Sequence, residues 1–529
     1  MSYRVEPQII ESFRGVRELN GINSGGAISA LECKNVELVQ SEIGNATGIK
    51  TVQGNTLIQL LPNGFSCIEL FESVQDGISY TIIYGESENE GRLFYVDITE
   101  TLQTLVSGLK KTNQAEGLTM SSTAFDVFVF SNGEDVRTVC FTTDSAYASV
   151  VQDHNPQQIA GGGYVATIEA VDFLGRSIKF LSMTEWNGFL VVASQYGVHS
   201  SHQNNVYKWD DNPENKANSW YIDFGKPTTA VVSFTGGLYI FTQDDVTFLN
   251  TTPNDTANSI LQTVAMNGCF SHKSFVKHDI YLFFYDNKQK NIFYMQITDT
   301  GQTRPAGPVA QEIQSKFNDI ERFKMYSCIY NNRNEIWCLI NDEILIYDYT
   351  QKEWVTRKEQ EINSIALIKN VVYSGDNNGC IRAENYGISF DGQKQARYQT
   401  TYINIGSNTN MKKQKTPLLI TLNTNATNDF YVQLICNGKE KNPKHINIEN
   451  AIDGKFAQND AITAPENQTW GTAIWASETK YNKRVVEVST PQTWYTLSIV
   501  FYTQNLGQGF YIQSVELKNI KAKSKTRGR

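Results

Sequence analysis

The stretch from Asn334 to Arg382 constrains the fold most strongly, because it repeats short apolar runs that end in turn residues. The runs are 335–340, 344–349, 354–355, 365–368 and 371–373. They are rich in β-branched and aromatic residues and are separated by Asn, Asp and Gly, which predicts short antiparallel strands joined by tight turns. Both alternating faces of the run 335–340 are apolar, so this strand needs cover on both sides. The stacked small sheets of a propeller provide such cover.

The same hairpin unit recurs along the chain. Further copies start near residues 78, 126, 188, 237, 279 and 370. Propeller blades of four strands repeat about every 40–50 residues, and the spacing fits this period with insertions around 145–165 and 200–220. We therefore predict a degenerate β-propeller of six or seven blades over residues 61–394.

The two flanks differ from this body. Residues 1–60 contain few strong strand patterns and are interpreted as an extended N-terminal arm. After Gly392 the strands lengthen, and the runs 484–488, 496–502 and 510–517 alternate apolar and polar residues. This alternation predicts a separate β-sandwich over residues 395–529. The expected fold class is all-β, with an arm (1–60), a propeller (61–394) and a sandwich (395–529).

Composition limits the classes of partner and compartment. The net charge is −9 and the isoelectric point is near 5.4, so most of the surface should repel nucleic acid. The eight cysteines include no CxxC pair and mostly lie in apolar runs, which indicates buried free thiols in a reducing cytoplasm. The first residues show no signal-peptide pattern, and no apolar run approaches the roughly 20 residues of a membrane span. We expect a protein without stable membrane insertion.

Patterns that would carry catalysis or bind a metal are weak. His199 and His202 have ligand-type side chains but no third ligand nearby, so an ordinary polar loop is the favoured interpretation. The Asp-rich turns 285–288 and 375–379 could hold calcium, yet hairpin turns explain them better. No nucleophile motif Gly-x-Ser-x-Gly occurs. We expect no enzyme activity, no catalytic residue, no metal and no cofactor.

The last twelve residues form the candidate contact site, because they are basic and contain no acid. The candidate residues are Lys518, Lys521, Lys523, Lys525, Arg527 and Arg529. Such a tail can bind nucleic acid by counterion release or pair with an acidic neighbour. A solvated terminal segment is the third possibility, and the sequence leaves all three open.

In layout the chain resembles the β-propeller tail proteins of short-tailed bacteriophages, that is, their nozzle, hub or DNA-stabilisation proteins. The segments 13–15, 35–36 and 50–54 resemble the family's Gly-rich opening. Residues 228–241 followed by 245–249 resemble its readout hairpin, and Asn334 to Trp354 resembles its strand–turn–strand with a closing Lys-Glu-Trp. The basic tail and a length shorter than that of many nozzles depart from the pattern.

This resemblance implies a structural virion protein without catalytic residues. Family members form rings, commonly hexameric, below the portal and adaptor rings, where they retain the genome and conduct DNA during ejection. Partners would be further copies, the portal-adaptor ring, other tail proteins and passing genomic DNA. The protein would be assembled in the bacterial host cytoplasm and located in the virion tail. The alternatives are a glycan-binding or glycan-cleaving propeller for host-surface recognition and an intracellular scaffold.

Overall fold

The computed structural model describes most of the chain as β-structure, which confirms the all-β prediction. It describes all residues except 1, 5–7, 11, 17–26, 41–46, 53–54, 98, 161, 173, 196, 211–217, 254–260, 298–302, 331–332, 342, 359–361, 385–394, 404–410, 415, 424–426, 428, 448–482, 492, 506–507 and 524–529. The helical segments among the described residues are α1 (Ser145–Val150) and the 3-10 segment η1 (Gln311–Phe317). No helix in this described part is long and apolar enough to cross a membrane.

The chain divides into two compact units whose boundaries differ from the expected ones. Unit 1 contains Met1–Thr56, Leu345–Lys358 and Asn385–Arg529, and unit 2 contains Leu57–Ile344 and Glu359–Glu384. The expected separate arm is therefore part of the same unit as the C-terminal sheets. The chain passes between the two units four times, at 56/57, 344/345, 358/359 and 384/385.

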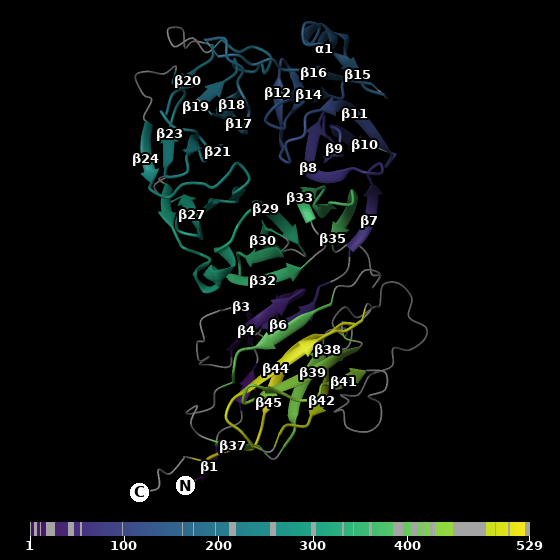
Figure 1. Cartoon of the computed structure of the whole chain (residues 1–529), viewed down its shortest axis with the longest axis vertical. Helices are drawn as coiled ribbons and strands as arrows, with labels where there is room; N and C mark the ends of the chain where they lie inside the picture. The colour runs from purple at the N-terminus through teal and green to yellow at the C-terminus, as the bar shows by residue number, and fades with distance from the viewer. Residues whose placement is uncertain are drawn as a thin grey trace, which may run out of the picture. The chain divides into compact units, whose positions relative to one another are not determined.

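Unit 2 consists of small antiparallel sheets that follow one another around a ring in chain order (Figure 1). The strands are β8 (Ser66–Gln75), β9 (Ile78–Glu86), β10 (Gly91–Val96) and β11 (Leu102–Leu109); β12 (Glu116–Ser122), β13 (Phe125–Ser131), β14 (Val136–Cys140), β15 (Gln157–Gln158) and β16 (Tyr164–Thr167); β17 (Ser182–Trp186), β18 (Phe189–Ser194), β19 (Gly197–Ser200) and β20 (Tyr221–Ile222); β21 (Ala230–Phe234), β22 (Gly237–Phe241), β23 (Val246–Leu249) and β24 (Leu261–Ala265); and β25 (Phe275–His278), β26 (Tyr281–Asp286), β27 (Asn291–Ile297) and β28 (Thr303–Ala306). The hairpin β29 (Phe323–Tyr330) and β30 (Arg333–Ile340) comes next.

The last sheet of the ring is completed by an N-terminal strand. It contains β33 (Ile362–Ile368), β34 (Val371–Asp376), β35 (Cys380–Glu384) and β7 (Asn55–Leu60), and it lies beside the first sheet. The backbone N–H of Leu70 in β8 donates a hydrogen bond to Ser364 Oγ in β33 over 2.8 Å. Such a ring of small sheets is the arrangement of a β-propeller. The apolar pattern is satisfied as predicted, since Trp337 in β30 is fully buried.

A repeated polar residue explains why the hairpins of unit 2 turn where they do. Ser87, Asn132, Thr242, Asp286 and Asp376 each stand at the turn between the second and third strands of their sheet. Each side chain accepts hydrogen bonds from two backbone amides of its own turn. This local capping satisfies amides that the strand ladder leaves free. The Asp-rich turns are thus hairpin caps, as the sequence indicated.

Unit 1 combines the N-terminal strands with the C-terminal ones. Its strands are β1 (Ser2–Arg4), β2 (Gln8–Ile10), β3 (Ser12–Val16), β4 (Ala27–Lys34), β5 (Val36–Gln40), β6 (Thr47–Thr51), β32 (Glu353–Lys358), β36 (Arg397–Thr400), β37 (Met411–Gln414), β38 (Leu418–Asn423), β39 (Asp429–Cys436), β40 (Lys439–Glu440), β41 (Lys444–Asn447), β42 (Lys483–Val488), β43 (Thr493–Trp494), β44 (Leu497–Tyr502), β45 (Tyr511–Leu517) and β46 (Ile520–Lys523). The remaining strand, β31 (Glu343–Asp348), spans the boundary between the units.

The segment expected to be an arm forms strands that pair with the C-terminal strands of unit 1. β2 and β6 both pair with β45, while β4 pairs with β36, which continues into β44 and β39. Phe13 in β3 is buried and meets Tyr398 edge-on. Burial alternates along β38 and β39, as predicted for strands with one face in a core. An extended free arm was therefore the wrong interpretation, because apolar residues such as Ile10 and Phe13 are buried in their own unit.

Candidate functional site

The candidate basic residues do not form one free tail. Lys521 and Lys523 belong to β46, whose backbone pairs with β1 on one side and β37 on the other. Lys518 lies before this strand and forms an ion pair of 2.9 Å with Glu516. Lys525, Arg527 and Arg529 lie outside the described residues. The prediction of a basic tail is wrong for residues 520–523, because they form β46, an inner strand of a small sheet with the order β1-β46-β37-β43.

This small sheet, which we call the cationic sheet, has one buried side. Lys412, Gln414 and Trp494 are buried, and so is Ile520. Lys412 Nζ donates to Tyr495 O over 2.9 Å and lies 5.8 Å from the ring centre of Trp494. Burial lowers the pKa of the Lys412 amine. The neighbouring Lys413 and the strand residue Lys521 are exposed instead.

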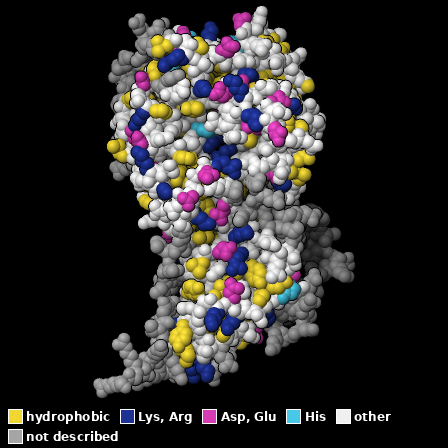
Figure 2. Space-filling model, in the orientation of Figure 1, with side chains coloured by type: hydrophobic (Ala, Val, Ile, Leu, Met, Phe, Trp, Pro, Cys, Tyr) yellow, Lys and Arg dark blue, Asp and Glu magenta, His cyan; other side chains and the backbone are white. Residues whose placement is uncertain are grey.

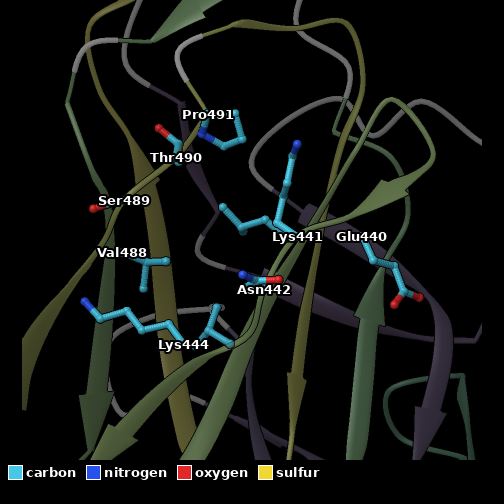
Figure 3. Close-up of a pocket in the computed structure, with 10 residues that line it drawn as sticks. Glu440, Lys441, Asn442, Lys444, Val488, Ser489, Thr490 and Pro491 are labelled. Carbon is cyan, nitrogen blue, oxygen red and sulfur yellow. The ribbon is translucent and has the colours of Figure 1, made fainter.

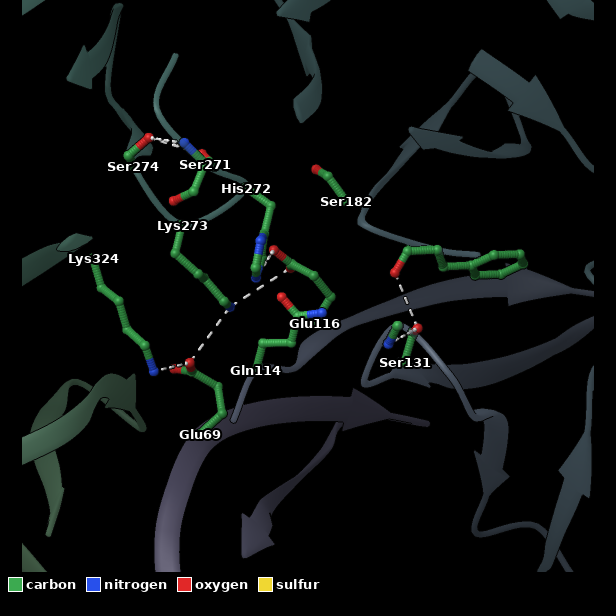
Figure 4. A network of polar contacts seen from close by, with 12 residues as sticks. Glu69, Gln114, Glu116, Ser131, Ser182, Ser271, His272, Lys273, Ser274 and Lys324 are labelled. Atoms are coloured by element: carbon green, nitrogen blue, oxygen red, sulfur yellow. Dashed lines mark hydrogen bonds and ion pairs between the residues drawn. The ribbon is translucent and has the colours of Figure 1, made fainter. Parts of the chain in front are cut away.

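A second site, in unit 2, is a cluster of buried charges that we call the inner charge cluster (Figure 4). Its members come from the first strands of several sheets and from the loop before β25. These first strands contact one another around the ring, as β8 does with β12 and with β33, and β29 with β25 and with β33. The cluster contains Glu69, Glu116, His272, Lys273, Lys324, Tyr326 and Ser364.

The Glu69 side chain is almost fully buried, with 1% of it exposed. Its carboxylate accepts hydrogen bonds from Lys324 Nζ at 2.9 Å, Tyr326 OH at 3.0 Å and Ser364 Oγ at 2.8 Å. Burial opposes ionisation of Glu69, but Lys273, Lys324 and Ser364 together hold the pKa of this carboxyl below its ordinary value. Burial lowers the pKa of Lys324, which Glu69 partly restores.

Lys273 connects Glu69 to a second carboxyl. Its Nζ lies 3.9 Å from Glu69 Oε2 and 3.6 Å from Glu116 Oε2. Burial raises the pKa of Glu116 to about 7, against the opposing effect of Lys273. Burial also lowers the pKa of His272 to about 3, and both lysines add to this shift. His272 is therefore neutral near pH 7, and its Nε2 lies 3.9 Å from Glu116 Oε1.

The cluster can hold neighbouring sheets together and exchange a proton near neutral pH. The sequence analysis missed it, because its paired residues are separated by up to 295 positions, as Ser364 and Glu69 are. A charged residue within the first strands β8, β12 and β29 (Glu69, Glu116 and Lys324) was the available signal. Among the described residues no group of His, Cys, Asp and Glu has the geometry to hold a metal ion.

His199 and His202, considered above as possible metal ligands, lie in two different environments. His199 is buried, stacks on Tyr221 and is hydrogen-bonded to Ser194. His202 is hydrogen-bonded to Asp210. Neither arrangement brings the two rings to one ligand. The cysteines follow the prediction of buried thiols, since all except the half-buried Cys380 are buried.

Unit 1 also contains a hollow of about 480 Å³ (Figure 3). Apolar side chains from β39 and β42 and polar groups around them form its lining. Lys444 spans from β41 to β42 and donates to the backbone carbonyl of Glu487 over 2.5 Å. The lining residues are Val432, Leu434, Glu440, Lys441, Asn442, Lys444, Val488, Ser489, Thr490 and Pro491.

Comparison with known proteins identifies no family for this chain. No protein-family model matches the sequence, and no curated protein matches it either. Similar solved structures include the computationally designed Ika8 protein (10% identity, 63% of this chain, 99% of that chain, TM-score 0.36). Another is the extracellular domain of a putative one-component system from B. thetaiotaomicron (10% identity, 79% of this chain, 50% of that chain, TM-score 0.40). A third is BamB from Moraxella catarrhalis (8% identity, 74% of this chain, 99% of that chain, TM-score 0.36). Likeness at these TM-scores carries no argument about function.

Proposed function

We propose that this chain is a structural protein of the tail of a short-tailed bacteriophage, assembled as a ring below the portal and adaptor. The observation that carries the proposal is the interlaced course of the chain. The chain passes between its two units four times, and N-terminal strands are built into the sheets of both. Four covalent connections, rather than one linker, suit a part that must bear mechanical load while DNA is retained and released.

In this proposal unit 2 is the body of a seven-bladed propeller. The sheets β8–β11, β12–β16, β17–β20, β21–β24 and β25–β28 supply five blades. The hairpin β29–β30 supplies the next blade together with β31, which spans the boundary between the units, and β32, which belongs to unit 1. β33, β34 and β35 form the seventh with β7, which precedes the first blade in the sequence. A ring closed by strands from both sides of the repeat resists opening, because separating the first and last blades requires breaking a strand pair.

The sequence resemblance and the acidic composition support the same role. A net charge of −9 keeps most of the surface from binding phosphate tightly, as a passive conduit requires. The sixfold ring and the portal-adaptor partners come from the resemblance. No catalytic step is part of this function.

The proposal is tested by imaging the purified protein in negative stain, together with mass spectrometry of phage particles that carry its gene. Ring-shaped particles with sixfold class averages, and peptides of this chain in washed particles, are the expected result. A chain that stays monomeric at high concentration and is missing from the particles would overturn the proposal.

A further inference from the structure

We propose that the cationic sheet is a binding surface for the sugar–phosphate backbone of nucleic acid, with Lys413 and Lys521 as contact residues. The inference names a partner surface of the proposed tail protein and relies on that function only for identifying the ligand as genomic DNA. Binding itself can be measured on the purified chain.

Strand register is the first observation. Lys521 in β46 stands opposite Arg4 in β1 and opposite Lys413 in β37, so three cationic positions form one row across three strands. Neighbouring strands lie about 4.8 Å apart. Like charges directly opposite each other destabilise a sheet. The four strands carry Arg4, Lys412, Lys413, Lys521 and Lys523 and no Asp or Glu.

The second observation is that this charge remains open to solvent. The other side of the sheet is occupied by the buried Trp494, Gln414 and Ile520, whereas Lys413 and Lys521 are exposed. Lys and Arg side chains gather at the end of unit 1 near β1 and β37 in Figure 2. Nearby Lys518 shows the contrasting case, because Glu516 neutralises it. The two exposed lysines that face each other in the register, Lys413 and Lys521, repel each other in the fold, and this repulsion is offset when a polyanion binds.

The chemistry of the surface favours nucleic acid over an acidic protein. Protein interfaces have apolar or aromatic anchors at their centre and are depleted in Lys. Here the row itself is Lys and Arg, and the sequence beyond it adds Lys525, Arg527 and Arg529 without an acid. A line of cations gains affinity by releasing condensed counterions from phosphates, whatever the base sequence. Because the rest of the chain is acidic, repulsion elsewhere would direct the polyanion to this sheet.

The test is a salt titration of binding to a short DNA duplex of random sequence, followed by fluorescence anisotropy. The full-length chain is compared with the double variant Lys413→Gln/Lys521→Gln. The slope of log K against log salt is negative, and each lost phosphate contact reduces its magnitude by about 0.9. The wild type should therefore lose about tenfold more affinity than the variant between about 50 and about 200 mM salt.

Two further variants make the result specific. Lys439→Gln/Lys441→Gln removes two exposed lysines from the hairpin after β39 in the same unit and should leave the slope unchanged. Lys413→Arg/Lys521→Arg keeps the charge and should bind as the wild type does. Circular dichroism melts verify that each variant is folded. Deleting 518–529 is unsuitable, because it removes β46 from the centre of the sheet.

An unchanged slope in Lys413→Gln/Lys521→Gln, or no duplex binding at about 50 mM salt, overturns the inference. So does poly-glutamate that competes with DNA at equal charge concentration, since that outcome assigns the surface to an acidic protein. The proposed ring assembly would be contradicted by a different observation, namely monomers in the negative-stain images. DNA binding by a protein that forms no ring would leave this inference standing and remove only the proposed tail function.

Discussion

His272 Nε2 and Glu116 Oε1 lie 3.9 Å apart in the inner charge cluster. Folding changes the pKa values of these two side chains in opposite directions. The pKa of Glu116 is raised to about 7, so the folded state binds this proton more tightly than the unfolded state does. Its contribution to stability is therefore present at low pH and is lost as the pH rises from 4.5 to about 7. The pKa of His272 is lowered to about 3, and its contribution is lost as the pH falls from 6.5 to about 3.

We predict that Glu116→Gln changes the pH dependence of unfolding in a defined direction. The difference in unfolding free energy, variant minus wild type, should rise with pH from about 4.5 to about 7 and then level off, by at most about 3 kcal/mol. The contact with Lys273 is part of this pH dependence, because Lys273 lowers the pKa of Glu116 in the folded wild type. Urea unfolding at a series of pH values measures this difference.

His272→Gln is the matched control. Its difference in unfolding free energy, variant minus wild type, should rise in the opposite direction of pH, that is, as the pH falls below 6.5. Other charged and titratable groups around the pair are Glu69 on β8, Lys273 beside His272, and Lys324 and Tyr326 on β29. A pH-independent difference for Glu116→Gln would mean that its carboxyl titrates normally in the folded protein.

The buried pair Glu69–Lys324 gives a second prediction for single residues. Lys324→Met leaves the Glu69 carboxylate without its closest cation in a site where 1% of it is exposed. Breaking a buried ion pair in this way costs about 3–5 kcal/mol. The double variant Glu69→Gln/Lys324→Met should recover most of this loss in urea unfolding. If the double variant is as unstable as Lys324→Met, the cost arises from packing rather than from the unpaired charge.

At the scale of elements, the closure of the ring depends on close approach between its first and last sheets. A Cβ at Gly375 in β34 would lie 2.3 Å from Cys67 Sγ in β8. Gly375→Ala should therefore push these sheets apart and cost about 1–3 kcal/mol. Adding Cys67→Ala removes the sulfur, so the double variant should be less destabilised than the sum of the two single variants. Additive effects in thermal or urea unfolding would contradict this contact.

Strand identity was largely predictable from sequence, because period-2 apolar runs and turn residues act locally. The starts expected near 78, 237 and 370 coincide within one residue with β9, β22 and β34. The pairing partners of distant strands were not predictable. Nothing local in 520–523 indicates that this segment pairs with both the N-terminus and 411–414. The cationic row therefore became visible only from the register.

For the whole molecule, the main difference from the sequence expectation concerns residues 1–60. Their sparse strand pattern indicated an extended arm, yet β2 through β6 take part in the sheets of unit 1 and β7 completes the last sheet of unit 2. The physical reason is burial. Phe13 and Ile49 are almost fully buried and Gly15 lies against the backbone of Trp354, where a Cβ would come within 2.1 Å of its carbonyl oxygen. Such fits depend on three-dimensional neighbours more than 300 positions away.

This integration predicts that the N-terminal strands are protected within a single chain. Hydrogen exchange of peptides covering β2 and β3 should be slow at the lowest measurable protein concentration and independent of concentration, because their amides pair within the same unit. Removing residues 2–16 should lower the melting temperature, since it deletes strands that pair with β4, β6, β45 and β46. Protection that appears only as the concentration rises would instead mean that these strands are exchanged between copies, and the truncated chain would then lose its oligomers while keeping its melting temperature.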